Sequence, residues 1–351
     1  MANYNSYFVN RSRNCTKKLR EIEKELPDFV QDYFIGIENN SSELTRLNYG
    51  YDLRLFFNWL VYEADIFDDI KSPTELELSD LNRIKSRHIE RYLSYLSNYE
   101  DKDGKVKVNT ERGKARKLAS LRSMFKYFYR HDQIKEDVAS KVPTPKLHQK
   151  AITRLETDEV AKFLDTAESG NGLAGHAKSY HKHTQVRDVA LTTLLLGTGM
   201  RISECVGLNL SDLDFANNAV KITRKGGNQT ILYFSDEVKV ALIDWINVRN
   251  TNEFLADEPA LFTSLQNRRI TPRAVQNLVK KYAQIITPLK HITPHKLRST
   301  YGTNLYRETG DIYIVADVLG HKDVNTTKKH YAAISEDLRR NVANKVKLRE
   351  G

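Results

Sequence analysis

Cysteine is nearly absent from this chain of 351 residues, which contains only Cys15 and Cys205. Two cysteines so far apart give neither a disulfide framework nor the paired spacing of a zinc site. Long apolar runs are also missing. The longest, from Val189 to Leu196, contains two threonines and is far shorter than the ~20 residues that span a bilayer. The first residues lack the apolar core of a signal peptide. We therefore expect a cytoplasmic protein with no membrane attachment.

Acidic residues are fewer than basic ones. The chain has 55 Lys and Arg residues against 45 Asp and Glu, a net charge of +10 and a pI near 9.3. Such a balance favours a polyanionic partner, either nucleic acid or an acidic membrane surface. Between Lys102 and Lys150, fourteen basic residues stand against five acidic ones, so this segment carries most of the excess.

An apolar stripe runs through the same basic segment. Ala115, Leu118, Leu121, Phe125 and Phe128 recur at helical spacing and should face a core. A charge run is often only a solvated surface. Here, a helix with one buried face and a basic beginning is suited to hold a phosphate backbone. The candidate DNA-binding residues, expected to lie off the stripe, are Arg112, Lys114, Arg116, Lys117 and Arg122.

The length of the chain predicts two domains. The first half shows several amphipathic helices, one of which Ser41 and Ser42 can cap, and Pro143 and Pro145 disfavour helix at its end. The second half mixes helices with a predicted hairpin, so the fold class is mainly α with a small β component. The expected divisions are a tail or helix at 1–25, a helical domain at 26–142, a linker at 143–151 and an α+β domain at 152–351.

The second half begins with a helix that Thr157 is expected to cap. Residues 170–183 are rich in Gly, His and Ser and are predicted to form a loop, and residues 186–196 an apolar helix. Two β-rich stretches, 220–224 and 230–234, enclose a glycine turn and predict a hairpin.

Four short stretches of this half could carry chemistry. In the first, two glycines precede Arg201, and Glu204 lies on the same helical face three residues later. Taken alone, this pair would be a surface ion pair. The second is Lys225, at the mouth of the hairpin turn, where a lysine by itself indicates little.

The third stretch places His295 and Arg298 on one side of a helix that begins at a proline. Two cationic donors in a first helical turn favour an anion, because the free N–H groups there point the same way. The fourth is Leu-Gly-His, ending at His321, with Tyr331 ten residues later. A lone tyrosine after a helix is usually a packing residue, and each stretch is weak by itself.

Read in order, these stretches give Arg, Lys, His-x-x-Arg, Leu-Gly-His and Tyr between Gly197 and Tyr331. This set resembles the tyrosine recombinase (phage integrase) family, and is similar to its Xer-like members. The resemblance implies a helical, SAM-like core-binding domain followed by the α+β catalytic domain. It also implies a C-terminal exchange helix and a homo-tetramer on two DNA recombination sites, and leaves room for an accessory protein. The catalytic residues that it implies are Arg201, Lys225, His295, Arg298, His321 and Tyr331, with Glu204 in support.

The chemistry of a phosphodiester explains why such residues are needed. Arginine forks can clamp the non-bridging oxygens as negative charge builds on them. Tyr331 would attack phosphorus, His295 would accept its proton, and Lys225 would protonate the departing 5′ oxygen. The covalent 3′-phosphotyrosine conserves the bond energy, so the reaction needs neither ATP nor a metal or other cofactor.

Other interpretations remain open. The chain could be a DNA-binding protein that kept this fold and lost catalysis, or a metal-dependent nuclease. A zinc site at His176, His181 and His183 is a weaker option without a further ligand. Within the family, chromosome-dimer resolution and the integration, excision or inversion of a mobile element are all compatible with the sequence.

Overall fold

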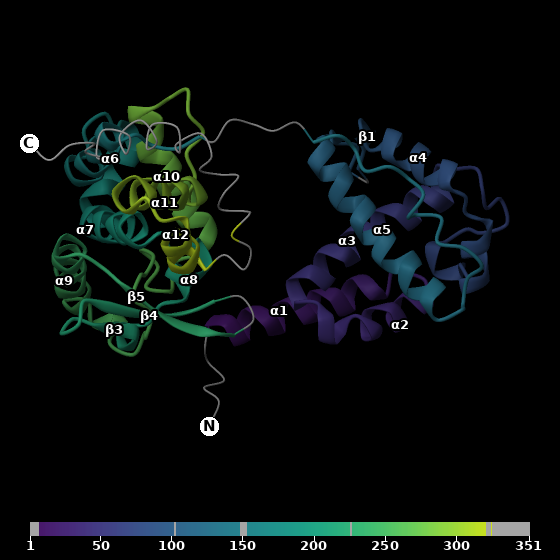
Figure 1. Cartoon of the computed structure of the whole chain (residues 1–351), viewed down its shortest axis with the longest axis horizontal. Coiled ribbons are helices and arrows are strands. Elements are labelled where there is room, and N and C mark those ends of the chain that lie inside the picture. The colour runs from purple at the N-terminus through teal and green to yellow at the C-terminus, as the bar shows by residue number, and fades with distance from the viewer. Residues whose placement is uncertain (1–6, 102, 148–152, 225–226, 321–323, 325–351) are drawn as a thin grey trace, which may run out of the picture. The chain divides into compact units, whose positions relative to one another are not determined.

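The computed structural model describes residues 7–101, 103–147, 153–224, 227–320 and 324. The chain divides into two compact units, residues 1–150 and 151–351 (Figure 1). Both are mainly helical with few strands, which confirms the predicted fold class. Across the described part of the chain, no helix is long and apolar enough to cross a membrane.

Helices dominate the first unit. They are α1 (Tyr7–Glu23), α2 (Phe29–Gly36), α3 (Glu43–Tyr62), α4 (Ser86–Tyr95) and α5 (Glu111–Arg130), with short 3-10 turns at Glu38–Asn40, Pro73–Glu75 and Leu78–Arg83. Two short strands, β1 (Tyr99–Glu100) and β2 (Val106–Lys107), pair antiparallel. Among the described residues of this unit, the β1–β2 pair departs from the purely helical structure that the sequence predicts.

The apolar stripe of α5 forms the centre of this unit. Four of its five predicted members are fully buried, and only Ala115 is partly exposed. Phe128 meets the ring of Phe29 edge-on at 5.5 Å between centroids, and Phe29 in turn meets Phe57. Of the two predicted caps, Ser41 and Ser42, it is Ser42 that caps α3, because its hydroxyl accepts from the backbone N–H of Thr45.

Helix α1 packs on α3 through its buried residues Cys15, Leu19 and Ile22. A glycine on α3 leaves room for the Leu19 side chain at this contact. A Cβ added at Gly50 would lie 2.9 Å from the Leu19 side chain, closer than such contacts occur. Gly50 therefore leaves space for the side chains of Leu19 and Ile22 on α1.

Helices also dominate the second unit, around one small antiparallel sheet. The helices are α6 (Thr157–Ser169), α7 (Gly175–Thr198), α8 (Ile202–Gly207), α9 (Asp236–Asn250), α10 (Pro272–Ile286), α11 (Pro294–Thr309) and α12 (Ile312–Leu319), with 3-10 turns at Leu210–Asp212 and Glu253–Leu255. The strands are β3 (Leu213–Asp214), β4 (Ala219–Thr223) and β5 (Gln229–Tyr233), in the order β3-β4-β5. The β4–β5 pair is the predicted hairpin.

Helix α7 runs through the middle of the unit, in contact with α6, α9 and α11. It begins at Gly175, so the predicted loop over residues 170–183 is wrong for most of its length. Packing explains the difference: His181 is buried, and its Nε2 lies 2.9 Å from the carbonyl oxygen of Ala167 on α6. Thr157 is the first residue of α6 rather than its cap, a place taken by Glu156.

Candidate active site

The first candidate arginine follows the end of α7. Gly199 terminates that helix at φ 61°, a left-handed conformation that favours glycine. Arg201 then caps α8, and Glu204 accepts its backbone N–H at 2.7 Å and its Nη1 at 2.9 Å. The Glu204 side chain is 2% exposed and that of Arg201 is 36% exposed. The predicted pair is thus more than a surface contact, because a buried carboxylate fixes both the backbone and the guanidinium of Arg201.

The second candidate arginine lies on α11. This helix begins at Pro294 as predicted, and Arg298 is buried in its second turn. Its Nη1 donates to the carbonyl of Gly199 at 2.6 Å, and its Nη2 donates to the carbonyl of Leu319. Arg298 therefore joins the turn before Arg201 to the end of α12.

Three guanidinium groups meet at that end of α12. Besides Arg298, Arg201 donates through Nη2 to Gly320 O at 3.2 Å, and Arg224 donates through Nη2 to Val318 O at 3.0 Å. The last carbonyls of a helix lack intrahelical donors and carry partial negative charge. They can therefore hold several cations together, although like charges repel. The result is a concentration of positive charge, part of it open to solvent at Arg201, that suits an anion.

The remaining predicted catalytic residues are placed less completely. His295 is exposed in the first turn of α11, three residues before the buried Arg298. Lys225, His321 and Tyr331 lie outside the described residues. The roles of all six residues stay predictions.

Arg224 is a residue that the sequence analysis missed. It directly precedes Lys225 in the hairpin, and no motif singles it out. Its side chain reaches α12, some ninety residues further along the chain. The sequence does not indicate this contact, because the two residues are far apart in the chain and belong to no repeating pattern.

In the first unit, the structure corrects one expectation about the basic start of α5. Lys117 is buried rather than turned away from the apolar stripe. Its Nζ donates to Asn109 Oδ1 at 3.0 Å and lies 3.9 Å from Asp52 Oδ1. Burial raises the pKa of Asp52 and lowers the pKa of Lys117, since it disfavours either charge, and their mutual attraction opposes both shifts. Lys117 thus joins α5 to α3.

The other four basic candidates differ in how far they reach solvent. Arg112 is exposed, and Lys114 pairs with a glutamate one turn earlier. The Arg116 side chain is 50% exposed and pairs with Asp52. Arg122 binds the carbonyls of Ala139 and Val142 and the hydroxyl of Thr144, which holds the end of the unit in place. Contact with DNA stays a prediction for all five residues.

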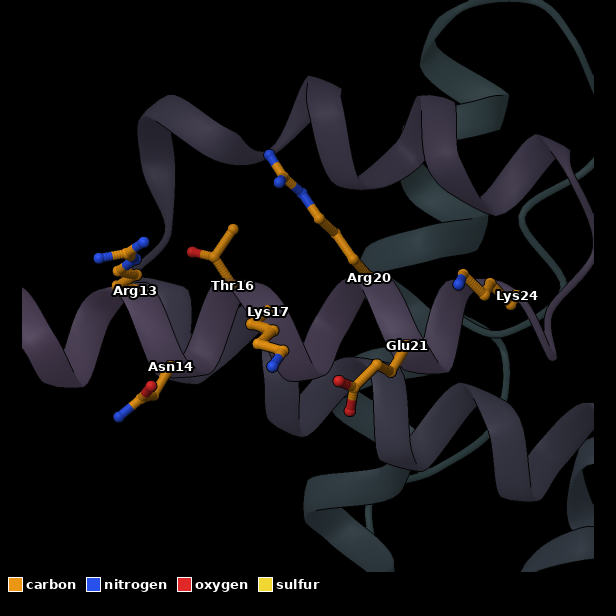
Figure 2. A pocket seen from close by; sticks show the side chains of 7 residues that line it. All are labelled: Arg13, Asn14, Thr16, Lys17, Arg20, Glu21 and Lys24. Carbon is orange, nitrogen blue, oxygen red and sulfur yellow. The ribbon is translucent and has the colours of Figure 1, made fainter.

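A second basic surface lies on α1, outside the segment that the sequence predicts to bind DNA. Seven residues line a hollow of about 590 Å³, and Figure 2 shows their side chains along one helix. Four of the seven are exposed cations spaced four, three and four residues apart. At about 100° per residue they fall on one stripe, opposite the buried face. The cations of this α1 stripe are Arg13, Lys17, Arg20 and Lys24.

Among the described residues, no group of three His, Cys, Asp or Glu side chains lies close enough together to hold a metal ion. His181, one of three histidines considered as a zinc site, is instead buried against α6.

Comparison with known proteins decides the family. The model of the phage integrase family matches residues 153–337, more than half of the chain. The chain belongs to the phage integrase family of tyrosine recombinases. This confirms the predicted resemblance. One relative in this family, the tyrosine recombinase XerC of Caldanaerobacter subterraneus subsp. tengcongensis, is 32% identical, with 98% of this chain and 95% of the relative covered. Another, XerS of Lactococcus lactis subsp. cremoris, is 28% identical, with 92% of this chain and 96% of the relative covered.

Solved structures of recombinases share the fold. XerH bound to a palindromic difH substrate, in a post-cleavage complex, aligns with a TM-score of 0.64 and 18% identity, and covers 94% of this chain and 87% of that one. A lambda integrase tetramer bound to a Holliday junction aligns with a TM-score of 0.60 and 15% identity over 86% and 76%.

Proposed function

We propose that this chain is a site-specific recombinase that cuts and rejoins DNA through a covalent bond between Tyr331 and a phosphate. One observation carries the proposal: Arg201 and Arg298 lie together at the end of α12, directly before His321 in the sequence. Two fixed guanidinium groups are what a phosphodiester requires as its equatorial oxygens gain charge. Family membership over residues 153–337, a range that includes Tyr331, supports the same chemistry.

The reaction follows from the donors available. Arg201 and Arg298 bind the non-bridging oxygens, with His321 as a third donor. The Tyr331 oxygen bonds to phosphorus while the bond to the 5′ oxygen breaks, and His295 accepts the phenol proton. The Lys225 ammonium protonates the departing 5′ oxygen. Rejoining reverses these steps on a new 5′ hydroxyl, so no energy source is consumed.

A nicked substrate tests the chemistry. On DNA that releases a short fragment after cleavage, the wild-type protein should accumulate as a covalent adduct visible by denaturing electrophoresis. Tyr331→Phe should bind the same DNA with unchanged Kd and give no adduct. Adduct formation by that variant would refute the nucleophile assignment. A wild-type protein that binds but never forms an adduct would favour the alternative, a DNA-binding protein without catalysis.

We also assign the α1 stripe to the DNA backbone. Its four cations extend over about 17 Å, at 1.5 Å of rise per residue. One strand of B-DNA presents a phosphate about every 3.4 Å of axis, or about five in that length. For the α1 stripe, the net charge of +10 makes a polyanion a more favourable partner than the equally basic surface of a second copy.

The salt dependence of binding tests the α1 stripe. Replacing Lys17 and Arg20 with Gln should weaken binding and lower the slope of log K against log salt by up to about 1.8, because each neutralised phosphate contributes about 0.9. Replacing Arg11 and Lys18 with Gln is the matched control, with the same loss of charge on the same helix but off the stripe. Equal slopes for the two variants would exclude the stripe.

The biological setting is proposed on the relatives. Xer-like relatives and a tetrameric lambda integrase on a Holliday junction favour a cytoplasmic tetramer that exchanges strands between two short sites. We infer a role in chromosome-dimer resolution, since the alignments with XerC and XerS extend over nearly the whole chain. Sequencing the DNA that is covalently trapped in cells would reveal the sites. Trapped DNA from a single chromosomal locus would support chromosome-dimer resolution. Trapped DNA from the ends of a mobile element would instead indicate integration.

A further inference from the structure

Arg224 connects the β4–β5 hairpin to the end of α12. Its backbone N–H donates to Asn228 O at 2.8 Å, and its carbonyl accepts from Gly227 N–H at 3.1 Å, so the backbone closes the hairpin turn. Its side chain leaves the hairpin and donates to Val318 O at 3.0 Å. One residue therefore fixes the base of the turn to the helix end that Arg201 and Arg298 also hold.

The side chain of Arg224 occupies a place that only a glycine at position 320 leaves open. A Cβ added at Gly320 would lie 1.6 Å from Nη1 and 2.4 Å from Cζ of Arg224, and Gly320 has φ 61°. The Nε of Arg224 is buried and has no hydrogen-bond partner among the described residues. An unpaired buried donor is unfavourable, so this placement costs stability and invites a functional explanation.

We propose that Arg224 is a positioning residue for strand cleavage. Arg224 directly precedes Lys225, the proposed proton donor, in the sequence. Arg224 therefore holds the residue beside the proposed donor at the helix end where Arg201 and Arg298 also bind. This role rests on the proposed function of Lys225, and the experiment below separates the two.

A substrate with sulfur in place of the bridging 5′ oxygen tests the proposal. A thiol has a pKa near 8.5, so the sulfur can leave as a thiolate without a proton. On ordinary DNA, Arg224→Ala and Lys225→Ala should each form the covalent adduct about 100-fold more slowly, the lower range for losing general acid catalysis. On the sulfur substrate both should recover to within about 10-fold of wild type. Arg201→Ala should remain slow on both, because its loss concerns the phosphate oxygens.

Each outcome decides something. If Lys225→Ala recovers and Arg224→Ala does not, Arg224 acts on the phosphate or on folding, and the positioning role is wrong while Lys225 keeps its own. If neither recovers, both assignments fail. Arg224→Lys keeps a charge near Val318 without the fork, and should give an intermediate rate on ordinary DNA and full recovery on sulfur.

A matched variant guards against a purely structural effect. Arg249 also binds backbone carbonyls in the second unit, those of Leu255, Glu258 and Ala260, and none of α12. Arg249→Ala should lower the melting temperature and leave the ratio of rates on the two substrates at the wild-type value. A recovery by Arg249→Ala like that of Arg224→Ala would show that the sulfur substrate rescues general damage, and would overturn the proposal.

Discussion

Replacing Glu204 with Gln isolates the charge that holds Arg201. Glutamine keeps an acceptor for the backbone N–H of Arg201, as the capping arrangement at the start of α8 requires. It removes the negative charge opposite the guanidinium, which Glu204 binds at 2.9 Å. The shape of the side chain hardly changes, so the variant tests electrostatics and orientation rather than packing.

The solvent exposure of Arg201 and Glu204 determines how much stability the Glu204→Gln variant should lose. A hydrogen bond to a charged group contributes about 1.5–3 kcal/mol, and breaking a fully buried ion pair costs about 3–5 kcal/mol. Arg201 is 36% exposed, so water can solvate the guanidinium once its partner is neutral. The free energy of unfolding should therefore fall by about 2 kcal/mol. For a unit of about 200 residues this lowers the melting temperature by about 4–8 °C.

The effect on catalysis should exceed the effect on DNA affinity. With Glu204 neutral, the Arg201 fork is held less firmly and binds the phosphate in fewer productive orientations. Cleavage of a nicked substrate should slow by about 10-fold, which corresponds to about 1.4 kcal/mol in the barrier. Binding of intact DNA, measured by anisotropy, should stay within about two-fold of wild type, because many backbone contacts share the affinity.

Glu159→Gln is the matched control. Glu159 accepts the backbone N–H of Glu156 at 2.8 Å and pairs with Lys290 at 2.6 Å, so it repeats the Glu204 arrangement at the start of α6. This variant should lose comparable stability and cleave at the wild-type rate. Equal slowing by both variants, or normal cleavage by Glu204→Gln despite its lower stability, would refute the link between Glu204 and the reaction.

Three further outcomes are expected. Arg201→Ala should reduce adduct formation by two or more orders of magnitude with little change in Kd, and a near-normal rate would show that the phosphate clamp is misassigned. Arg112→Gln should lower the slope of log K against log salt by about 0.9, and an unchanged slope would remove α5 from the DNA face. Asp188→Asn should cost about 3–5 kcal/mol in urea unfolding, because this buried carboxylate accepts from Tyr282, Arg187 and Lys281; a loss below 1 kcal/mol would contradict that.

Features that depend on residues close together in the chain could be predicted from the sequence. Helical periodicity predicted the buried face of α5, and the adjacent Ser41 and Ser42 predicted the start of α3. Spacing of three residues predicted that Arg201 meets Glu204. Each involves residues within about one turn of each other or one repeating pattern, so the chain itself specifies the distance.

Features that depend on distant partners did not follow from the sequence. The sequence predicts that Lys117 is a surface cation, yet Lys117 is buried and its Nζ lies 3.9 Å from Asp52 Oδ1. Residues 170–183 looked like a loop, yet packing of His181 against α6 extends α7 through most of them.

The order of Arg, Lys, His, Arg, His and Tyr along the chain was enough to indicate the family. Only the tertiary structure decided that Arg201, Arg224 and Arg298 would share the end of one short helix. The physical reason is that free carbonyls at a helix end can gather cations from any part of the chain, and a linear pattern does not record which ones arrive.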